Sequence, residues 1–397
     1  MRMVLAGEWV AGARQEELRS PYSGEVIDSV PVADVQDVDR AIAAAVRGAE
    51  HQRQLTGYER EAILRRAGDI ADSRVDNVAR AISLETGKPI AEATAEASRV
   101  GHVLRLSGFE GSQLYGDSLP LDAAPNGGSH RLGFTLRQPC GVVVAITPFN
   151  FPALLVVHKI GPALAAGNSV VLKPARQTPL TALKLTEILL EAGLHPEAIS
   201  CITGAGGDLG DALCGDPRVR KISFTGSTET GERITRVAGV KKLSLELGAS
   251  CPVVVLPDAD IELAASAIAV GGYANSGQVC ISVQRVVADR AVVGDLLDAL
   301  IPKVEAIKLG DPSQPETGMG SLISEHDAIR VEAALHEGSQ NGAQLLTGGE
   351  RSGSVLTPAI VANVDPSSPL SQDELFGPAV AVSTATDIEM AIAIANA

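Results

Sequence analysis

Between Cys140 and Gly248 short apolar runs alternate with helix-length segments, and this alternation constrains the fold more than any other feature of the sequence. The apolar runs are GVVVAIT, NSVVLKPA, ISCITG, VRKISFTGS and KKLSLELG. The segments between them, which we predict to be helices, cover residues 152–167, 179–193, 207–215 and 228–239. Continuous apolar strands separated by helices are typical of parallel sheets covered on both faces. We therefore predict a doubly wound α/β domain that binds its ligand beyond the carboxyl ends of the strands.

The flanking segments extend this architecture. Residues 37–108 show the roughly 3.6-residue period of amphipathic helices, whereas residues 112–139 mix glycine, proline and polar residues and favour an extended arm or hairpin. A second α/β unit is predicted from strands near 252–256, 281–288, 343–347 and 378–383 and helices near 260–274, 292–306 and 324–341.

Composition narrows the class of partner. The 397 residues include 48 acidic and 33 basic side chains, and the resulting charge of −15 is spread without a long like-charge block. This balance disfavours nucleic acid or a membrane surface and favours a small molecule. The start, MRMVLAGEWV, does not resemble a signal peptide, and no segment approaches the roughly 18 apolar residues of a membrane span, so we expect a cytoplasmic protein. The five cysteines are scattered without a C-x-x-C pair, which favours free thiols, and we predict no metal site.

Two glycine-containing loops, GAGGDLG (204–210) and FTGSTETG (224–231), each follow a predicted strand and open a predicted helix. Loops of this kind bind phosphate or nucleotide. Neither has the G-x-G-x-x-G spacing, so a tight turn or close packing remains an equal alternative for a single loop. Their recurrence in successive β-α units favours a dinucleotide crevice.

Four further residues have the right chemistry for a site, each with a simpler alternative. Lys173 ends a strand, where it could bond a ribose or phosphate or be a surface lysine. Asn150, in TPFNFP, could donate to an oxyanion or be a turn residue. Glu246 lies in an apolar strand, which favours either a functional carboxylate or an edge position. Cys280, in SGQVC, could be a nucleophile or a small buried residue, and Cys251 is its rival.

Taken in order, TPFNFP, KPARQTP, FTGS, LELGAS, SGQVC and ELFGP resemble the aldehyde dehydrogenase superfamily over nearly the whole chain. The spacings also agree, with 23 residues from Asn150 to Lys173 and 34 from Glu246 to Cys280. The resemblance implies that Cys280 adds to an aldehyde to give a thiohemiacetal, and that hydride transfer then leaves a thioester. It implies that Asn150 and the backbone N–H of Cys280 stabilise the oxyanion, and that Glu246 activates the water that releases the acid.

The resemblance also implies NAD or NADP as cofactor. The residues it places along the cofactor, from the adenosine ribose to the nicotinamide ring, are Lys173, Gly206, Gly210, Gly226, Ser227, Glu374 and Phe376. Members that prefer NAD usually carry a glutamate where this chain has Arg176. Because an arginine can pair with a 2′-phosphate, we predict that NADP is accepted at least as well as NAD.

On the same resemblance we predict a dinucleotide-binding domain of residues 1–111 and 140–246, an oligomerisation arm of 112–139, a catalytic domain of 247–397, and a homo-oligomer. Family chains continue past ELFGP to a strand that pairs with a partner subunit, so we expect this chain to be truncated, with an incomplete catalytic domain and only a remnant of the oligomerisation element. The alternative is a catalytically silent relative that binds nucleotide or a partner subunit. A thioesterase-like or coenzyme A-acylating enzyme is a third hypothesis, which the presence of Glu246 disfavours. We expect a small hydroxylated or charged aldehyde, such as lactaldehyde or glyceraldehyde phosphate.

Overall fold

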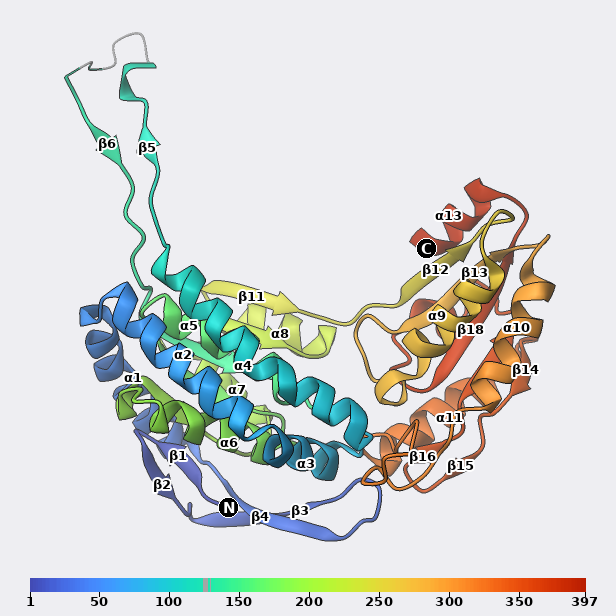
Figure 1. Ribbon diagram of the computed structural model, residues 1–397, viewed down its shortest axis with the longest axis horizontal. Coiled ribbons are helices and arrows are strands. Elements are labelled where there is room, and N and C mark those ends of the chain that lie inside the picture. The colour runs from blue at the N-terminus through green and yellow to red at the C-terminus, as the bar shows by residue number, and fades with distance from the viewer. Residues whose placement is uncertain (124–127, 129) are drawn as a thin grey trace.

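Two separate sheets organise the chain in the computed structural model, which describes residues 1–123, 128 and 130–397 (Figure 1). The larger sheet has seven strands in the order β11-β10-β7-β8-β9-β1-β2. Its five parallel strands are β7 (Val142–Ile146), β8 (Ser169–Lys173), β9 (Ile199–Cys201), β10 (Val219–Thr225) and β11 (Lys242–Glu246). An antiparallel edge is added by β1 (Met3–Leu5) and β2 (Glu8–Val10). The predicted parallel sheet is confirmed.

Helices cover both faces of this sheet because its strands are apolar on both sides. One face packs against α1 (Val35–Gln54), α7 (Gly207–Gly215) and α8 (Thr228–Ala238). The other packs against α5 (Leu154–Ala165) and α6 (Pro179–Glu191), and on these two helices pack α2 (Gly57–Ser73), α3 (Val75–Thr86) and α4 (Ile90–Ser112). The alternation of strand side chains is visible in β8, where Val171 faces the first layer and Val170 and Leu172 face the second.

The smaller sheet has five strands in the order β12-β13-β18-β17-β14. Their bounds are β12 (Cys251–Val255), β13 (Val283–Asp289), β14 (Gln344–Thr347), β17 (Ala359–Ala362) and β18 (Ala379–Ala385). The helices around them are α9 (Ile261–Tyr273), α10 (Val293–Glu305), α11 (Glu325–Gln340), the short α12 (Pro369–Gln372) and α13 (Ile388–Asn396). The sequence predicted four of these strands and missed β17, a strand of four residues.

Short elements complete the structure. Two small strand pairs lie outside both main sheets: β3 (Arg14–Arg19) with β4 (Val26–Val32), and β15 (Arg351–Ser352) with β16 (Val355–Leu356). The short turns η1 (Leu121–Ala123), η2 (Pro196–Ala198) and η3 (Ala274–Gly277) also lie outside them. None of the described helices is both long and apolar enough to cross a membrane.

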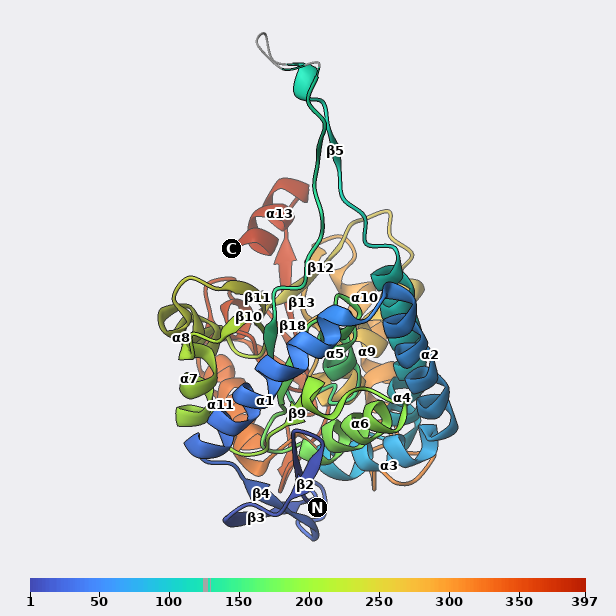
Figure 2. The ribbon, with the colours of Figure 1, turned by 90° about the vertical axis from the view of Figure 1, so that its left-hand side faces the viewer.

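The segment predicted as an arm contains β5 (Ser118–Leu119) paired antiparallel with β6 (Gly133–Phe134). Seen from either side, this ribbon projects away from both sheets (Figures 1 and 2). Residues 124–127 and 129 of the predicted arm lie outside the described residues. The arm's role in oligomerisation and the division into two functional domains stay predictions, although the chain passes from one sheet to the other at residues 247–250, next to the predicted boundary.

Candidate active site

Cys280 lies in the loop between η3 and β13, and the backbone before it is tightly bent. Asn275, Ser276 and Gly277 have successive positive φ angles of 49°, 56° and 71°. Position 277 requires glycine, because a Cβ there would collide with the carbonyl of Gly377. This bend leaves Cys280 partly exposed after a run of buried residues.

The loop places Cys280 in a cavity of about 710 Å³ that Glu246 also lines. The thiol of Cys251 lies outside this cavity's lining and donates to the carbonyl of Cys280, with an Sγ to O distance of 3.5 Å. Geometry therefore favours Cys280 over Cys251 as the thiol that meets a ligand.

Glu246 ends β11, which is the edge strand of the larger sheet, and its side chain is exposed. The carboxylate consequently avoids the burial cost that an interior position would impose. Lys159 of α5 lies in the same cavity, and its Nζ donates to Thr225 Oγ1 at 2.7 Å. Burial lowers the pKa of Lys159 to about 8, a shift that the charge of Glu246 opposes and that of Lys221 increases. The sequence analysis missed Lys159, although a lysine in the apolar helix LLVVHKIGPALA is a visible signal.

Asn150 is buried, and its side chain faces the cysteine loop. Its Nδ2 donates to the carbonyl of Gln278 at 2.9 Å, and Oδ1 has no hydrogen-bond partner among the described residues. A primary amide has two N–H donors, so one remains for a ligand. A third loop joins this region through Phe376, whose ring packs edge-on against Phe149 with centroids 5.8 Å apart.

Glu374, in that third loop, influences Cys280. Burial raises the pKa of the Cys280 thiol above its ordinary value, and the negative charges of Glu374 and Cys251 raise it further. The Glu374 carboxylate lies close to Gly248, where an added Cβ would displace its Oε2. These surroundings therefore favour the thiol over the thiolate form of Cys280.

Glu374→Gln is expected to lower the pKa of Cys280 and so increase its thiolate fraction. Because the thiolate is the form that reacts, the rate of alkylation by iodoacetamide at mildly alkaline pH should rise roughly two- to fivefold. The dependence of the alkylation rate on pH should shift to lower pH by the same amount as the pKa of Cys280. Glu350→Gln, at an exposed carboxylate before β15, is the control. An unchanged profile in Glu374→Gln would show that its charge does not reach the thiol.

A second cavity, of about 140 Å³, opens at the carboxyl end of β8. Lys173, Gly206 and Gly210 line it, together with Arg233 and Asp211, whose guanidinium and carboxylate are paired (Nη2 to Oδ2, 2.6 Å). Arg233 was not predicted as a site residue; only its place in the helix after the second glycine-containing loop hinted at it.

The glycines of this cavity are not explained by backbone strain or packing. Gly206 and Gly210 have no positive φ, and a Cβ on either would meet nothing within 4 Å. Lys173 is not a surface residue: it is buried, and burial lowers its pKa to about 8. Within the described residues its Nζ donates to the carbonyl of Pro174 alone, at 3.1 Å. Open space beside a helix N-terminus and a buried amine fit a nucleotide.

The second loop is different, because its residues have structural roles. A Cβ on Gly226 would collide with the ring of Phe224. Ser227 is the N-cap of α8, and its Oγ accepts from the N–H of Thr230 at 3.3 Å. Neither residue lines the two cavities above, so their predicted contacts with the cofactor stay predictions.

Arg176 is already paired. Its Nε donates to Glu16 Oε2 of β3 at 2.9 Å, and its Nη2 bonds the other oxygen. Arg176, Glu16 and Gln177 line a separate cavity of about 180 Å³. Although Arg176 is only three residues from Lys173, it does not line the Lys173 cavity. A 2′-phosphate would therefore have to compete with the Glu16 carboxylate for Arg176.

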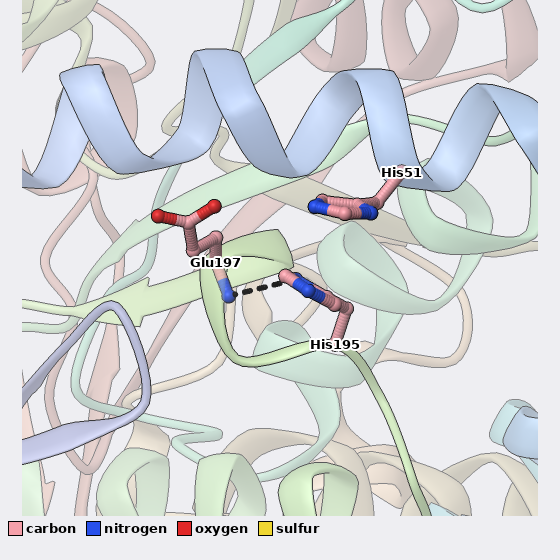
Figure 3. A group of neighbouring side chains, drawn as sticks. All are labelled: His51, His195 and Glu197. Atoms are coloured by element: carbon pink, nitrogen blue, oxygen red, sulfur yellow. Dashed lines mark hydrogen bonds between the residues drawn. The ribbon is translucent and has the colours of Figure 1, made fainter.

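Among the described residues one group, His51, His195 and Glu197, has ligand atoms close enough to suggest a metal (Figure 3). The two imidazoles are stacked with centroids 3.8 Å apart, and Nδ1 of His195 accepts from the backbone N–H of Glu197 at 3.3 Å. A metal-bound histidine instead donates through its second nitrogen. The Glu197 carboxylate is also bound by Arg47 at 2.6 Å. We interpret the group as a stacked pair beside an ion pair.

Comparison with known proteins identifies the family. Residues 9–397 match the sequence profile of the aldehyde dehydrogenase family. The chain belongs to this family. It is 40% identical over 390 residues to a 3-sulfolactaldehyde dehydrogenase of Priestia aryabhattai, covering 98% of this chain and 81% of the relative.

Solved aldehyde dehydrogenase structures confirm the fold. Betaine aldehyde dehydrogenase of Staphylococcus aureus, in complex with NAD+, superposes with a TM-score of 0.95 at 34% identity, covering 100% of this chain and 80% of that one. NADP-dependent glyceraldehyde-3-phosphate dehydrogenase of Bacillus halodurans C-125, complexed with NADP, gives a TM-score of 0.96 at 34% identity, covering 99% and 83%. The protein is an NAD(P)-dependent aldehyde dehydrogenase that oxidises an aldehyde to a carboxylic acid.

Proposed function

We propose that Cys280 is the nucleophile, that Glu246 is the general base, and that Asn150 with the backbone N–H of Cys280 stabilises the oxyanion. The observation that carries this proposal is the cavity shared by Glu246, which ends β11 of the larger sheet, and Cys280, in the loop before β13 of the smaller one. Asn150 supports it, because one N–H of its amide is held by Gln278 and the other is free to donate.

These roles give a complete reaction. The thiolate of Cys280 adds to the carbonyl carbon, and the Asn150 amide stabilises the negative oxygen of the thiohemiacetal. When bound, NAD or NADP supplies the hydride acceptor that allows the thiohemiacetal to become a thioester. Glu246 then takes a proton from water as the water attacks the thioester carbon, the acid leaves, and the Cys280 thiolate is restored.

For the cofactor we propose that Lys173, Gly206 and Gly210 hold the adenosine half. The residues proposed for the pyrophosphate and nicotinamide half are Gly226, Ser227, Glu374 and Phe376. Arg176 would favour NADP only by exchanging its Glu16 partner for the 2′-phosphate. The NADP complex of the Bacillus halodurans relative supports NADP use, and the NAD+ complex of the Staphylococcus aureus relative supports NAD.

For the substrate we propose a small aldehyde that carries an anionic group. His158, Lys159 and Lys221 line the cavity beside Cys280, where Glu246 is the one carboxylate in the described lining. Exposed Arg99 of α4, which packs on α5, adds a further positive charge: burial lowers the pKa of His158, and Arg99 and Lys159 lower it further. This local excess of positive charge contrasts with the net charge of −15 for the whole chain. The substrates named for two relatives, 3-sulfolactaldehyde and glyceraldehyde 3-phosphate, are anionic and support this proposal, whereas the betaine aldehyde named for the Staphylococcus aureus relative is a cation.

The proposal is tested by measuring the absorbance of the reduced cofactor that forms in reactions without added coenzyme A. Anionic aldehydes should be oxidised in preference to neutral ones of the same length, and Arg99→Gln should lower kcat/KM for the anionic substrates by roughly tenfold while leaving the neutral ones unchanged. Arg80→Gln, at an exposed arginine on α3, controls for the loss of one charge. Equal losses for both substrate types would refute the anion preference, and strict dependence on coenzyme A would refute hydrolysis.

We further propose that the protein is cytoplasmic and that it forms a homo-oligomer through the β5–β6 arm. Membership of the family supports the first, and the projection of the arm from both sheets supports the second (Figure 2).

A further inference from the structure

Lys88 and Glu96 form an ion pair that the reaction described above does not use. Both side chains are only 1% exposed, and Lys88 Nζ lies 2.5 Å from Glu96 Oε2. Removing two charges from water is costly, and such a pair is often no better for stability than apolar residues of similar size. Its remaining bonds therefore indicate what else it does.

Those bonds converge on residues 150–154. Lys88 Nζ donates to the backbone carbonyl of Asn150 at 2.8 Å and lies 4.0 Å from the centre of the Phe151 ring. The second oxygen of Glu96 accepts from the N–H groups of Ala153 and Leu154, at 2.9 and 3.0 Å, where α5 begins. The pair thus holds both ends of the segment that carries the Asn150 side chain.

The same carbonyl connects Lys88 to the cysteine loop. Asn275 Nδ2 also donates to the Asn150 carbonyl, at 3.1 Å, and the N–H of Asn275 donates to Glu92 of α4 at 2.9 Å. The Asn150 amide in turn donates to the carbonyl of Gln278, two residues before Cys280. Displacing the Asn150 backbone would therefore change the distance between the amide and Cys280.

Glu85 shows that capping a helix does not require the lysine. Its carboxylate accepts from the N–H groups of Leu180 and Thr181 at the start of α6, as Glu96 does at the start of α5. Glu85 has no ion-pair partner within the described ranges, and burial raises its pKa to about 8. Lys88 is consequently not explained by the cap alone, and its bond to Asn150 is what distinguishes the two sites.

We propose that Lys88 and Glu96 are positioning residues for the oxyanion-binding amide, acting through the backbone of Asn150. This inference depends on the role proposed for Asn150. Lys88 holds the backbone carbonyl of Asn150, and the carbonyl of Gln278 accepts one N–H of the Asn150 side chain. These two bonds fix the orientation of the second N–H of that amide. Misplacement of such a donor by about 1 Å can cost roughly a hundredfold in rate.

A double-mutant cycle separates this role from a general structural one. In the full-length protein, Lys88→Met and Asn150→Ala are made singly and together, and single-turnover formation of reduced cofactor is measured at saturating cofactor. We expect Lys88→Met to slow this step by about 10- to 100-fold, and to have almost no further effect in the Asn150→Ala background. Lys184→Met, at a partly exposed lysine on α6, should leave the rate unchanged.

Glu96→Gln provides a second cycle if Lys88→Met does not fold, because glutamine keeps an oxygen for the N–H groups of α5. Its rate loss should likewise disappear in the Asn150→Ala background. Losses that multiply in either cycle would overturn the positioning role, as would loss of cofactor affinity without a change in the single-turnover rate. If Asn150→Ala is itself as active as the parent, the role proposed for Asn150 fails instead.

Discussion

Cys280→Ala is expected to remove aldehyde oxidation, with a fall in turnover of at least roughly 10⁴-fold. The thioester cannot form without the thiol, and no second cysteine lines the cavity within the part of the chain that the structure describes. Cofactor binding should persist, because Lys173, Gly206 and Gly210 line a different cavity. Formation of reduced cofactor measures the loss, and quenching of intrinsic fluorescence by NAD or NADP measures binding.

Cys251→Ala is the matched control for this experiment. Its thiol only donates to the carbonyl of Cys280, so its removal should change turnover by no more than a few-fold. The reverse pattern, an inactive Cys251→Ala and an active Cys280→Ala, would assign the nucleophile to Cys251. Loss of both activity and cofactor binding in Cys280→Ala would point to misfolding and would require the thermal unfolding midpoints of the two variants to be compared.

The parallel sheet could be predicted because its strands are continuous apolar runs, a local property of the sequence. The order of those strands is not local. Glu246 looked like a carboxylate in an apolar strand, and only the position of β11 at the sheet edge makes it exposed. The N-terminal strands β1 and β2 were missed for a related reason: each has three residues, and β1 joins the sheet by pairing with β9, nearly two hundred residues away.

The site was predictable where a motif had a chemical signature and unpredictable where the partner was distant. Cys280 and Glu246, which were singled out from their motifs, both line one cavity, and their catalytic roles stay proposals. The partner of Arg176 is Glu16, 160 residues earlier, and the sequence around KPARQTP does not predict this contact. Lys88 and Lys159 had a weaker signal, since each is a lysine in a segment that the fold buries. A buried lysine requires a partner, but the sequence does not say which one.

Glu246→Gln should separate the two halves of the reaction. Acylation of Cys280 does not need the base, so reduced cofactor should appear as a burst of a single equivalent per active site. Turnover after the burst should fall by roughly 10²- to 10³-fold, because water is no longer activated against the thioester. Mass spectrometry of the stalled protein should find the acyl group on the peptide that contains Cys280.

The burst is what makes this result informative, because a merely damaged enzyme would lose both phases together. The control is Glu350→Gln, at an exposed carboxylate remote in sequence from β11. It should turn over like the parent and should show neither the burst nor the slow phase expected of Glu246→Gln. If Glu246→Gln turned over at the rate of the parent, the base would have to be another group. Lys159 would then be the first candidate, since it shares the cavity and burial lowers its pKa to about 8, which leaves a fraction of the amine neutral near physiological pH. Activity of Glu246→Gln that falls when Lys159 is replaced by methionine would move the base to Lys159, whereas a stalled acyl-enzyme in Glu246→Gln alone would fix it at Glu246.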